Sequence, residues 1–185
     1  MSILELQKHE KDDQEMEKML TEIINRIHSM ALIHQKIYSK ENIEKIDFAD
    51  YLRELVDSLV NNYVHSSKEI KVTYDLETTA PNLNQVIPCG LVINEVVTNA
   101  LQHGFAGREK GELKIAHSIE KNNYQIKIAN DGNSLPPDFD LEDSSSIGLK
   151  LVRMLTYDQL GGEVKIKDNE WVEFKIIFPV NQMSF

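Results

Sequence analysis

The sequence is poor in cysteine and in long apolar runs, and each shortage excludes a class of protein. Its single cysteine, Cys89, has no second cysteine with which to form a disulfide inside the chain. No apolar run approaches the roughly 20 residues that a membrane-spanning helix needs, and no signal-peptide pattern opens the chain. We therefore expect a cytoplasmic protein with no membrane segment in this chain.

Basic residues are also in deficit. The chain has 20 lysines and arginines against 30 aspartates and glutamates, which gives a formal net charge of -10. Proteins that follow nucleic-acid phosphates carry clustered basic residues, whereas the basic residues here are scattered, so we expect no nucleic-acid partner. The hydrophobic content of 41% over 185 residues is enough for the core of one ordinary domain with a helical extension.

The most informative pattern is a set of polar side chains in residues 90–105. Glu95, Asn99 and His103 recur at intervals of four and therefore share one face of a helix. The other faces are apolar, which indicates a largely buried helix whose polar stripe borders a cavity. A carboxylate one turn before an amide can poise a water or hydroxyl while the amide oxygen binds a hard cation. An ordinary amphipathic helix with a solvated stripe gives the same pattern, so both interpretations stay open.

The segments after this helix predict a sheet interrupted by one further helix. Residues 111–130 alternate in polarity as two strands, and a polar loop, NDGNSLP, covers residues 130–136. A helix is expected over residues 147–160, ended by Gly161 and Gly162. The last strand, in residues 171–179, alternates apolar and polar side chains and buries one face.

The segments before the helix complete the predicted fold. Asp47 is placed to cap a helix that follows it, and residues 70–76 alternate as a strand. Pro81 and Pro88 are expected to mark a loop and the start of the polar-striped helix. The result is an α+β fold, a two-layer sandwich in which a mixed, mostly antiparallel sheet has one face under three helices.

The amino-terminal region carries a heptad pattern that predicts association with a second chain. Its apolar positions are spaced alternately by four and three residues, which is typical of a helical bundle seam. Because one chain cannot cover this seam, we expect a homodimer through residues 14–39. The seam consists of Met16, Leu20, Ile23, Ile27, Met30, His34 and Ile37.

These motifs, in this order, resemble the sensor histidine kinases, whose ATP-binding domain has the Bergerat fold. Residues 25–63 and 87–105 are similar to a subgroup with the phosphoacceptor motif H-R-V-K-N-N-L-Q. That motif is absent, and SILELQ at residues 2–7 resembles the sequence that follows it, so we expect the phosphoacceptor histidine to lie outside this chain. The resemblance implies partial dimerisation helices and a connector in residues 1–64 and an ATP-binding domain in residues 65–185.

The resemblance implies a protein histidine kinase that uses ATP and Mg²⁺. The γ-phosphoryl group of ATP would pass to a histidine and then to a response regulator. One alternative is a non-catalytic module of the same fold that binds a nucleotide or a partner protein. Another is a serine kinase and anti-sigma factor of the same superfamily, against which the heptad helix argues.

The resemblance also implies roles for residues of the polar stripe. Asn99 matches the magnesium-binding asparagine, Glu95 matches the acidic or amide residue one turn earlier and is expected to be catalytic, and His103 lies near the phosphates. Gln102 stands where many relatives have a lysine that reaches the phosphates. The missing charge would have to come from Arg108, Lys110 or Lys150.

The loops supply the other nucleotide-binding residues. Asn130 stands where an aspartate accepts a hydrogen bond from the adenine amino group, a bond that an amide oxygen can also accept. Asp131 could replace it through a slip of one residue, and Gly132 keeps the backbone tight. A helix amino terminus is expected to offer N–H groups and a partial positive charge to the phosphates. Its residues are Ile147, Gly148 and Leu149.

Overall fold

The computed structural model describes residues 47–63, 68–142 and 146–180, together with positions 16, 20, 24, 27 and 31. A five-stranded sheet has the order β1-β2-β3-β5-β4. Strand β1 is parallel to β2, and the other neighbouring pairs are antiparallel. The strands are β1 (Glu69–Leu76), β2 (Lys110–Glu120), β3 (Asn123–Asn130), β4 (Glu163–Asp168) and β5 (Val172–Pro179).

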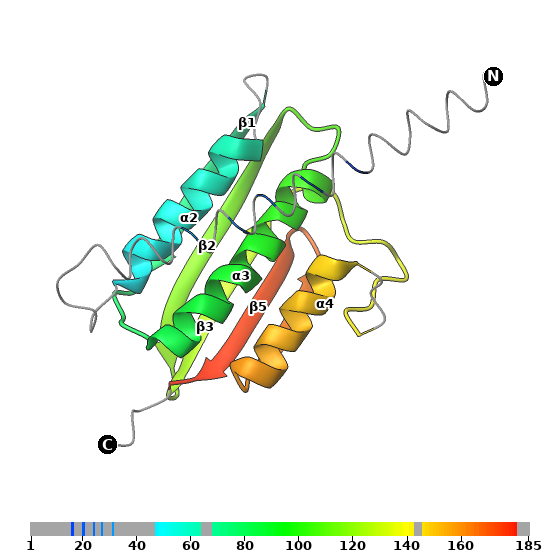
Figure 1. The fold of residues 1–185 in the computed structure, drawn as a ribbon. Coiled ribbons are helices and arrows are strands. Elements are labelled where there is room, and N and C mark those ends of the chain that lie inside the picture. Colours follow the sequence, from blue (N-terminus) through cyan, green and yellow to red (C-terminus); the bar gives the residue numbers. More distant parts are fainter. Residues whose placement is uncertain are drawn as a thin grey trace, which may run out of the picture.

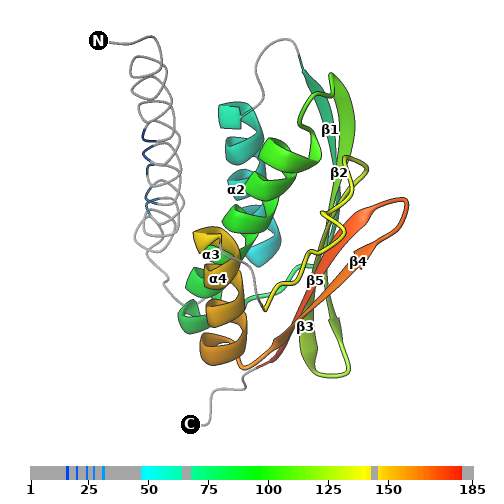
Figure 2. The ribbon, with the colours of Figure 1, turned by 90° about the vertical axis from the view of Figure 1, so that its right-hand side faces the viewer.

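Helices cover one face of this sheet, which confirms the predicted two-layer α+β fold (Figure 1, Figure 2). The α-helices that pack on the sheet are α2 (Phe48–Tyr63), α3 (Leu83–Asn99) and α4 (Ile147–Met154). Helix α3 continues into a π-helical segment, η1 (Ala100–Gly104), and α4 continues into another, η2 (Leu155–Gln159). None of the helices in the described part of the chain is both long and apolar enough to cross a membrane.

Alternating burial produces the core, as the sequence predicts. In β5 every second side chain is at most 5% exposed, namely Val172, Phe174, Ile176 and Phe178. Helix α2 buries one stripe in the same core, because its apolar residues recur at helical spacing. Full burial of each large apolar side chain stabilises the fold by about 1.5–3 kcal/mol. The predicted division of the chain at residue 64 stays a prediction, and α2, which ends just before it, packs in the core of the sheet domain.

The predicted start of α2 agrees with the structure, and the predicted start of α3 does not. The Oδ1 atom of Asp47 accepts hydrogen bonds from the N–H groups of Ala49 and Asp50 at 3.0 and 3.3 Å, which confirms the predicted cap of α2. The predicted start of α3 at Pro88 is wrong. Asn82 caps α3 by accepting from the N–H of Gln85 at 3.1 Å, and Pro88 lies inside the helix.

Few residues of the predicted bundle seam belong to the described part of the chain. Met16, Leu20 and Ile27 are helical and between 51% and 59% exposed, so these apolar side chains are not covered by the described residues of this chain. The other four seam positions, Ile23, Met30, His34 and Ile37, lie outside the described residues.

Candidate functional site

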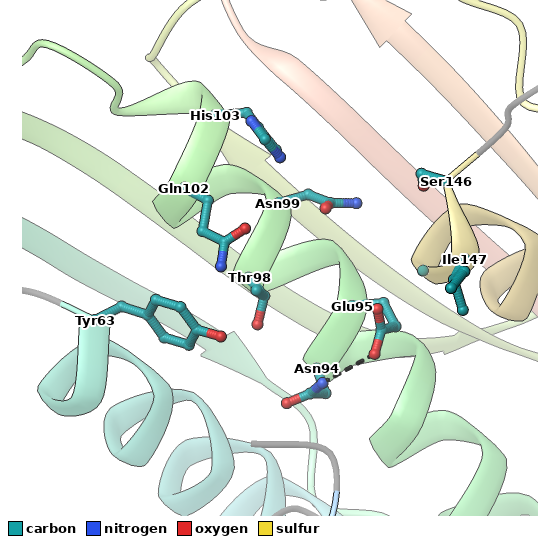
Figure 3. Close-up of a pocket in the computed structure, with 10 residues that line it drawn as sticks. Tyr63, Asn94, Glu95, Thr98, Asn99, Gln102, His103, Ser146 and Ile147 are labelled. Atoms are coloured by element: carbon teal, nitrogen blue, oxygen red, sulfur yellow. Dashed lines mark hydrogen bonds between the residues drawn. The ribbon is translucent and has the colours of Figure 1, made fainter. Parts of the chain in front are cut away.

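Two adjoining cavities lie between α3 and α4, and they share Asn99, His103 and Ser146. The first has a volume of about 180 Å³ and polar walls, which come from α3, η1, Tyr63 of α2 and the start of α4 (Figure 3). The second has a volume of about 410 Å³ and largely apolar walls formed by α3, β5, α4 and the loop after β3. A polar cavity beside an apolar one suits a ligand with one charged end and one flat apolar end.

The predicted polar stripe borders the first cavity. Glu95, Asn99 and His103 all line it, and Asn99 points across it toward Ser146 (Figure 3). The Glu95 side chain is 4% exposed, and its Oε1 atom accepts a hydrogen bond from Nδ2 of Asn94 at 3.1 Å. Because Asn94 is itself 2% exposed, the carboxylate is held by a buried donor rather than by solvent.

The last residue of the polar stripe, His103, lies in η1, where the α-helix widens. The N–H of Phe105 donates to the carbonyl of Ala100 at 2.9 Å, a five-residue step that defines a π turn. Gly104, the last residue of this turn, lies against the Asn130 side chain, since a Cβ at Gly104 would be 2.7 Å from Nδ2 of Asn130. The π turn therefore brings the backbone of Gly104 to the end of β3.

Asn130 lies at the end of β3 and lines the second cavity. Its side chain is 5% exposed, and its Nδ2 atom has no hydrogen-bond partner among the described residues. The surrounding walls are apolar and buried, with Val96, Leu149 and Phe174 each at most 9% exposed. A buried amide without a partner is costly in such surroundings unless a ligand pairs with it.

Asp131 and Gly132 do not line either cavity. The carboxylate of Asp131 accepts from the N–H of Glu112 at 2.7 Å, which directs it to the start of β2 and away from the cavity. The expected slip of one residue, with Asp131 in the place of Asn130, is therefore not seen. Gly132 packs on η1, because a Cβ there would be 2.3 Å from the carbonyl oxygen of Gly104.

The start of α4 closes the other side of the cavities. Ile147 and Gly148 line the first cavity and Leu149 lines the second. Ser146 caps the helix, with its Oγ atom accepting from the N–H of Leu149 at 3.1 Å. The first N–H groups of a helix have no acceptor within it and carry a partial positive charge, so this end of α4 is suited to an anion.

The three basic residues expected to replace the missing lysine charge do not reach the cavities. Lys110 pairs with Glu69, with 2.9 Å between Nζ and Oε2, and the Arg108 guanidinium donates to the carbonyl oxygen of Asp131. Lys150 is exposed and lines neither cavity. Within the described chain, no lysine or arginine lines either cavity. A bound polyanion would therefore depend on the α4 terminus and on a metal cation.

The first cavity has the donor set of a magnesium site shared with a ligand. It offers the side-chain oxygens of Asn99 and Glu95, and Mg²⁺ prefers oxygen donors. The described residues contain no cluster of three or more histidine, cysteine or acidic side chains that could hold a metal alone. Mg²⁺ bound through one or two protein groups together with phosphates and water fits this arrangement.

A second polar stripe beside the first was not identified from the sequence. Asn94, Thr98 and Gln102 recur at intervals of four, one residue before each member of the predicted stripe, and all three line the first cavity. Their spacing of four residues is the sequence signal that places them on one helix face. Ser146 was also missed, although a serine directly before I-G-L is a typical helix cap. Tyr63 comes from α2, and no local pattern marks its approach.

The loop after β3 is fastened at two points near the second cavity. The Phe139 ring meets that of Phe174 edge to face, with 6.5 Å between the ring centroids. The N–H of Leu135 donates to Oδ2 of Asp168 at 2.9 Å. Both Leu135 and Phe139 line the cavity, so the loop forms part of its wall.

Comparisons with known proteins agree with this architecture. A family model described as "Histidine kinase-, DNA gyrase B-, and HSP90-like ATPase" matches residues 84–182, and one described as "Histidine kinase" matches residues 1–63. Blue-light-activated histidine kinase 2 of Erythrobacter litoralis is 26% identical over 146 residues, which are 76% of this chain and 41% of that protein. Sensor histidine kinase PdtaS of Mycobacterium tuberculosis is 25% identical over 168 residues, which are 90% of this chain and 33% of that protein.

A solved structure with a similar fold is the histidine kinase domain of the Erythrobacter litoralis EL346 blue-light activated histidine kinase. It superposes with a TM-score of 0.76 at 23% identity, and the match covers 86% of this chain and 75% of that one. The likeness supports the fold. This chain spans less than half the length of the two curated relatives, with 41% and 33% of them covered.

Proposed function

This chain belongs to the histidine kinase-, DNA gyrase B- and HSP90-like ATPase family, and we propose that it is the ATP-binding catalytic part of a sensor histidine kinase. The observation that carries the proposal is the pair of adjoining cavities between α3 and α4. One is apolar with a buried amide at its wall, and the other is polar with Glu95, Asn99 and a helix amino terminus around it. These are the surroundings that a purine base and a phosphate chain need, respectively.

In this proposal the nucleotide lies across both cavities. The base enters the second cavity and meets Asn130, and the phosphates extend through the first toward Ile147 and Gly148. Asn99 holds Mg²⁺ together with the phosphates. When bound, Mg²⁺ neutralises phosphate charge and polarises the γ-phosphoryl group, which is needed here because no lysine or arginine among the described residues lines the cavities.

The residues of the chain position the reactants. Phosphoryl transfer requires little covalent chemistry from the protein, so alignment and charge stabilisation supply most of the effect. Asn94 holds the Glu95 carboxylate at the edge of the first cavity. There the carboxylate can orient an incoming imidazole ring by accepting a hydrogen bond from its N–H, and can then accept that proton. The γ-phosphoryl group leaves ADP as its bond to the bridging oxygen breaks, and it forms a phosphohistidine, from which it then passes to a response regulator.

The second candidate is a non-catalytic module of the same fold. The absence of a lysine or arginine from the described lining of both cavities favours it, because nucleotide affinity then rests on fewer charges. Partner binding in that case would not need Glu95. Nucleotide binding separates the proposal from a module that binds only a partner protein, and phosphorylation of a supplied histidine acceptor separates it from a module that binds nucleotide without catalysis.

Calorimetric titration with a non-hydrolysable ATP analogue, with and without Mg²⁺, tests the proposal. We expect binding that depends on Mg²⁺, and we expect Asn99→Ala to remove the dependence. Asn122→Ala is the matched control, because Asn122 is exposed in the turn between β2 and β3. No heat from a folded sample at millimolar nucleotide would favour the non-catalytic module.

A further inference from the structure

Asn130 gives the second cavity a recognition group with both a donor and an acceptor. A carboxylate in this place would only accept hydrogen bonds, whereas a side-chain amide has an NH₂ group and a carbonyl oxygen on the same plane. The two atoms are near equal in size, so rotation of the amide exchanges them without changing the shape of the cavity. The group can therefore match either of two opposite hydrogen-bonding patterns.

The glycines on either side make room for this amide. A Cβ at Gly104 would be 2.7 Å from Nδ2 of Asn130, and one at Gly132 would be 2.9 Å from the same atom. Any side chain at either position would collide with the amide, so the two glycines leave the room that Asn130 occupies at the cavity wall. It is 5% exposed, and Nδ2 has no partner within the described part of the chain. When the amide turns Nδ2 toward the cavity, a ligand there can supply the missing partner.

The polar side chains of Asp131 and Asn133, which follow Asn130 in sequence, are engaged in other hydrogen bonds and are not directed at a base in the second cavity. Asp131, the nearest acidic residue in sequence, uses its carboxylate on the N–H of Glu112. The Nδ2 atom of Asn133 donates to the carbonyl oxygens of His103 and Ala106 at 3.2 and 3.0 Å. None of the described residues that line the second cavity is acidic, so no negative charge there repels a carbonyl oxygen on a base.

The two purine classes present opposite patterns at their N1 edge. Adenine offers the 6-amino group as a donor and N1 as an acceptor. Hypoxanthine and guanine offer the 6-oxo group as an acceptor and N1–H as a donor. An amide forms two hydrogen bonds with either edge in one of its two orientations. A carboxylate has no donor, so against the 6-substituent it accepts from the 6-amino group of adenine and is repelled by a 6-oxo group, and a 6-oxopurine can give it only the hydrogen bond from N1–H.

We propose that Asn130 makes the second cavity a purine site that accepts 6-oxopurine nucleotides as well as adenine nucleotides. The inference rests on the proposed nucleotide-binding function and specifies its substrate class. Asn130 is then the residue that sets base selectivity, and a carboxylate at position 130, placed against the 6-substituent, favours adenine over a 6-oxopurine. Well-formed paired hydrogen bonds to a base edge discriminate by roughly 5-fold to 150-fold, so the effect is large enough to measure.

The test compares ATP, ITP and GTP by calorimetric titration of the chain in the presence of Mg²⁺. ITP has the 6-oxo edge without the 2-amino group of guanine, so it reports edge recognition separately from steric exclusion at C2. We expect the dissociation constants for ATP and ITP to lie within about tenfold of each other. Tight ITP binding with weak GTP binding also supports the proposal and assigns the rejection of guanine to the cavity wall.

Asn130→Asp is the informative variant, and it should shift the ratio of ATP to ITP affinity toward ATP by about tenfold or more. Asn122→Asp makes the same chemical change in the exposed turn before β3 and should leave the ratio unchanged. The ratio compares ATP and ITP affinity in the same variant. A general loss of stability weakens both affinities together and leaves their ratio unchanged.

Two results overturn the inference while leaving the proposed function intact. One is a wild-type preference for ATP over both ITP and GTP of about a hundredfold or more, which needs no variant to observe. The other is a ratio that Asn130→Asp does not move. Absence of binding by all three nucleotides contradicts the proposed function itself, and the inference falls with it.

Discussion

Gly132→Ala tests the contact between the loop after β3 and η1. The new Cβ would be 2.3 Å from the carbonyl oxygen of Gly104 and 2.6 Å from its carbonyl carbon. Both are backbone atoms and cannot rotate away, so one of the two segments must move by about 1 Å to restore an ordinary contact. Overpacking of this kind costs about 1–3 kcal/mol of unfolding free energy. The displacement also moves Asn130 and the cavity wall, so we expect at least about tenfold weaker nucleotide binding.

Gly107→Ala is the matched control for this prediction. Gly107 has a φ of +72°, and a Cβ there would meet nothing within 4 Å. It should therefore lose about 1–2 kcal/mol through backbone strain alone and keep its nucleotide affinity. Urea denaturation gives the free energies of unfolding, and calorimetry gives the affinities. Wild-type affinity in folded Gly132→Ala would refute the idea that this glycine contact shapes the site.

Three further predictions address charge, assembly and the acceptor. Gln102→Lys adds a cation to the first cavity and should tighten binding of ATP by about fivefold or more at low salt, less at high salt, as calorimetry at two salt concentrations would show. The double variant Leu20→Asp, Ile27→Asp places two charges on exposed apolar positions of the predicted seam and should convert the dimer to a monomer. Light scattering measures the oligomeric state, and a monomeric wild-type protein would count against the seam. This chain should gain no acid-labile label from radioactive ATP, because none of His9, His28 and His34 lies in a motif that resembles the phosphoacceptor motif, yet it should phosphorylate a supplied histidine-containing acceptor helix. Labelling lost in His28→Ala or His34→Ala would place the acceptor within the chain instead.

Periodicity explains why much of the fold follows from the sequence. The alternation in β5 and the polar stripe of Glu95, Asn99 and His103 depend only on spacing, and the structure has both. Predicting the start of α3 requires a choice between two local signals, an asparagine cap at Asn82 and a proline at position 88. The Asn82 cap outweighs Pro88, whose missing N–H leaves one carbonyl of the helix without its usual donor while the surrounding core keeps the helix intact.

Other features of the site depend on contacts between distant segments. The direction of Asp131 follows from the pairing of β2 with β3, where Leu113 opposes Asn130 and so places Glu112 next to Asp131. The sequence predicts the two strands but not this register at their end. The close approach of Gly104 and Gly132 to Asn130 likewise depends on how the end of η1 packs against the end of β3, and no local sequence pattern predicts that packing.

Hydrogen–deuterium exchange in the presence of a non-hydrolysable ATP analogue and Mg²⁺ tests the central claim most directly, because it reports where the nucleotide binds. We expect slower exchange at the end of α3, in residues 130–136 and at the start of α4, where the two cavities lie. We expect no change in the turn between β2 and β3 at the opposite end of β3. Binding of the analogue with protection elsewhere, and none around the two cavities, would contradict the account.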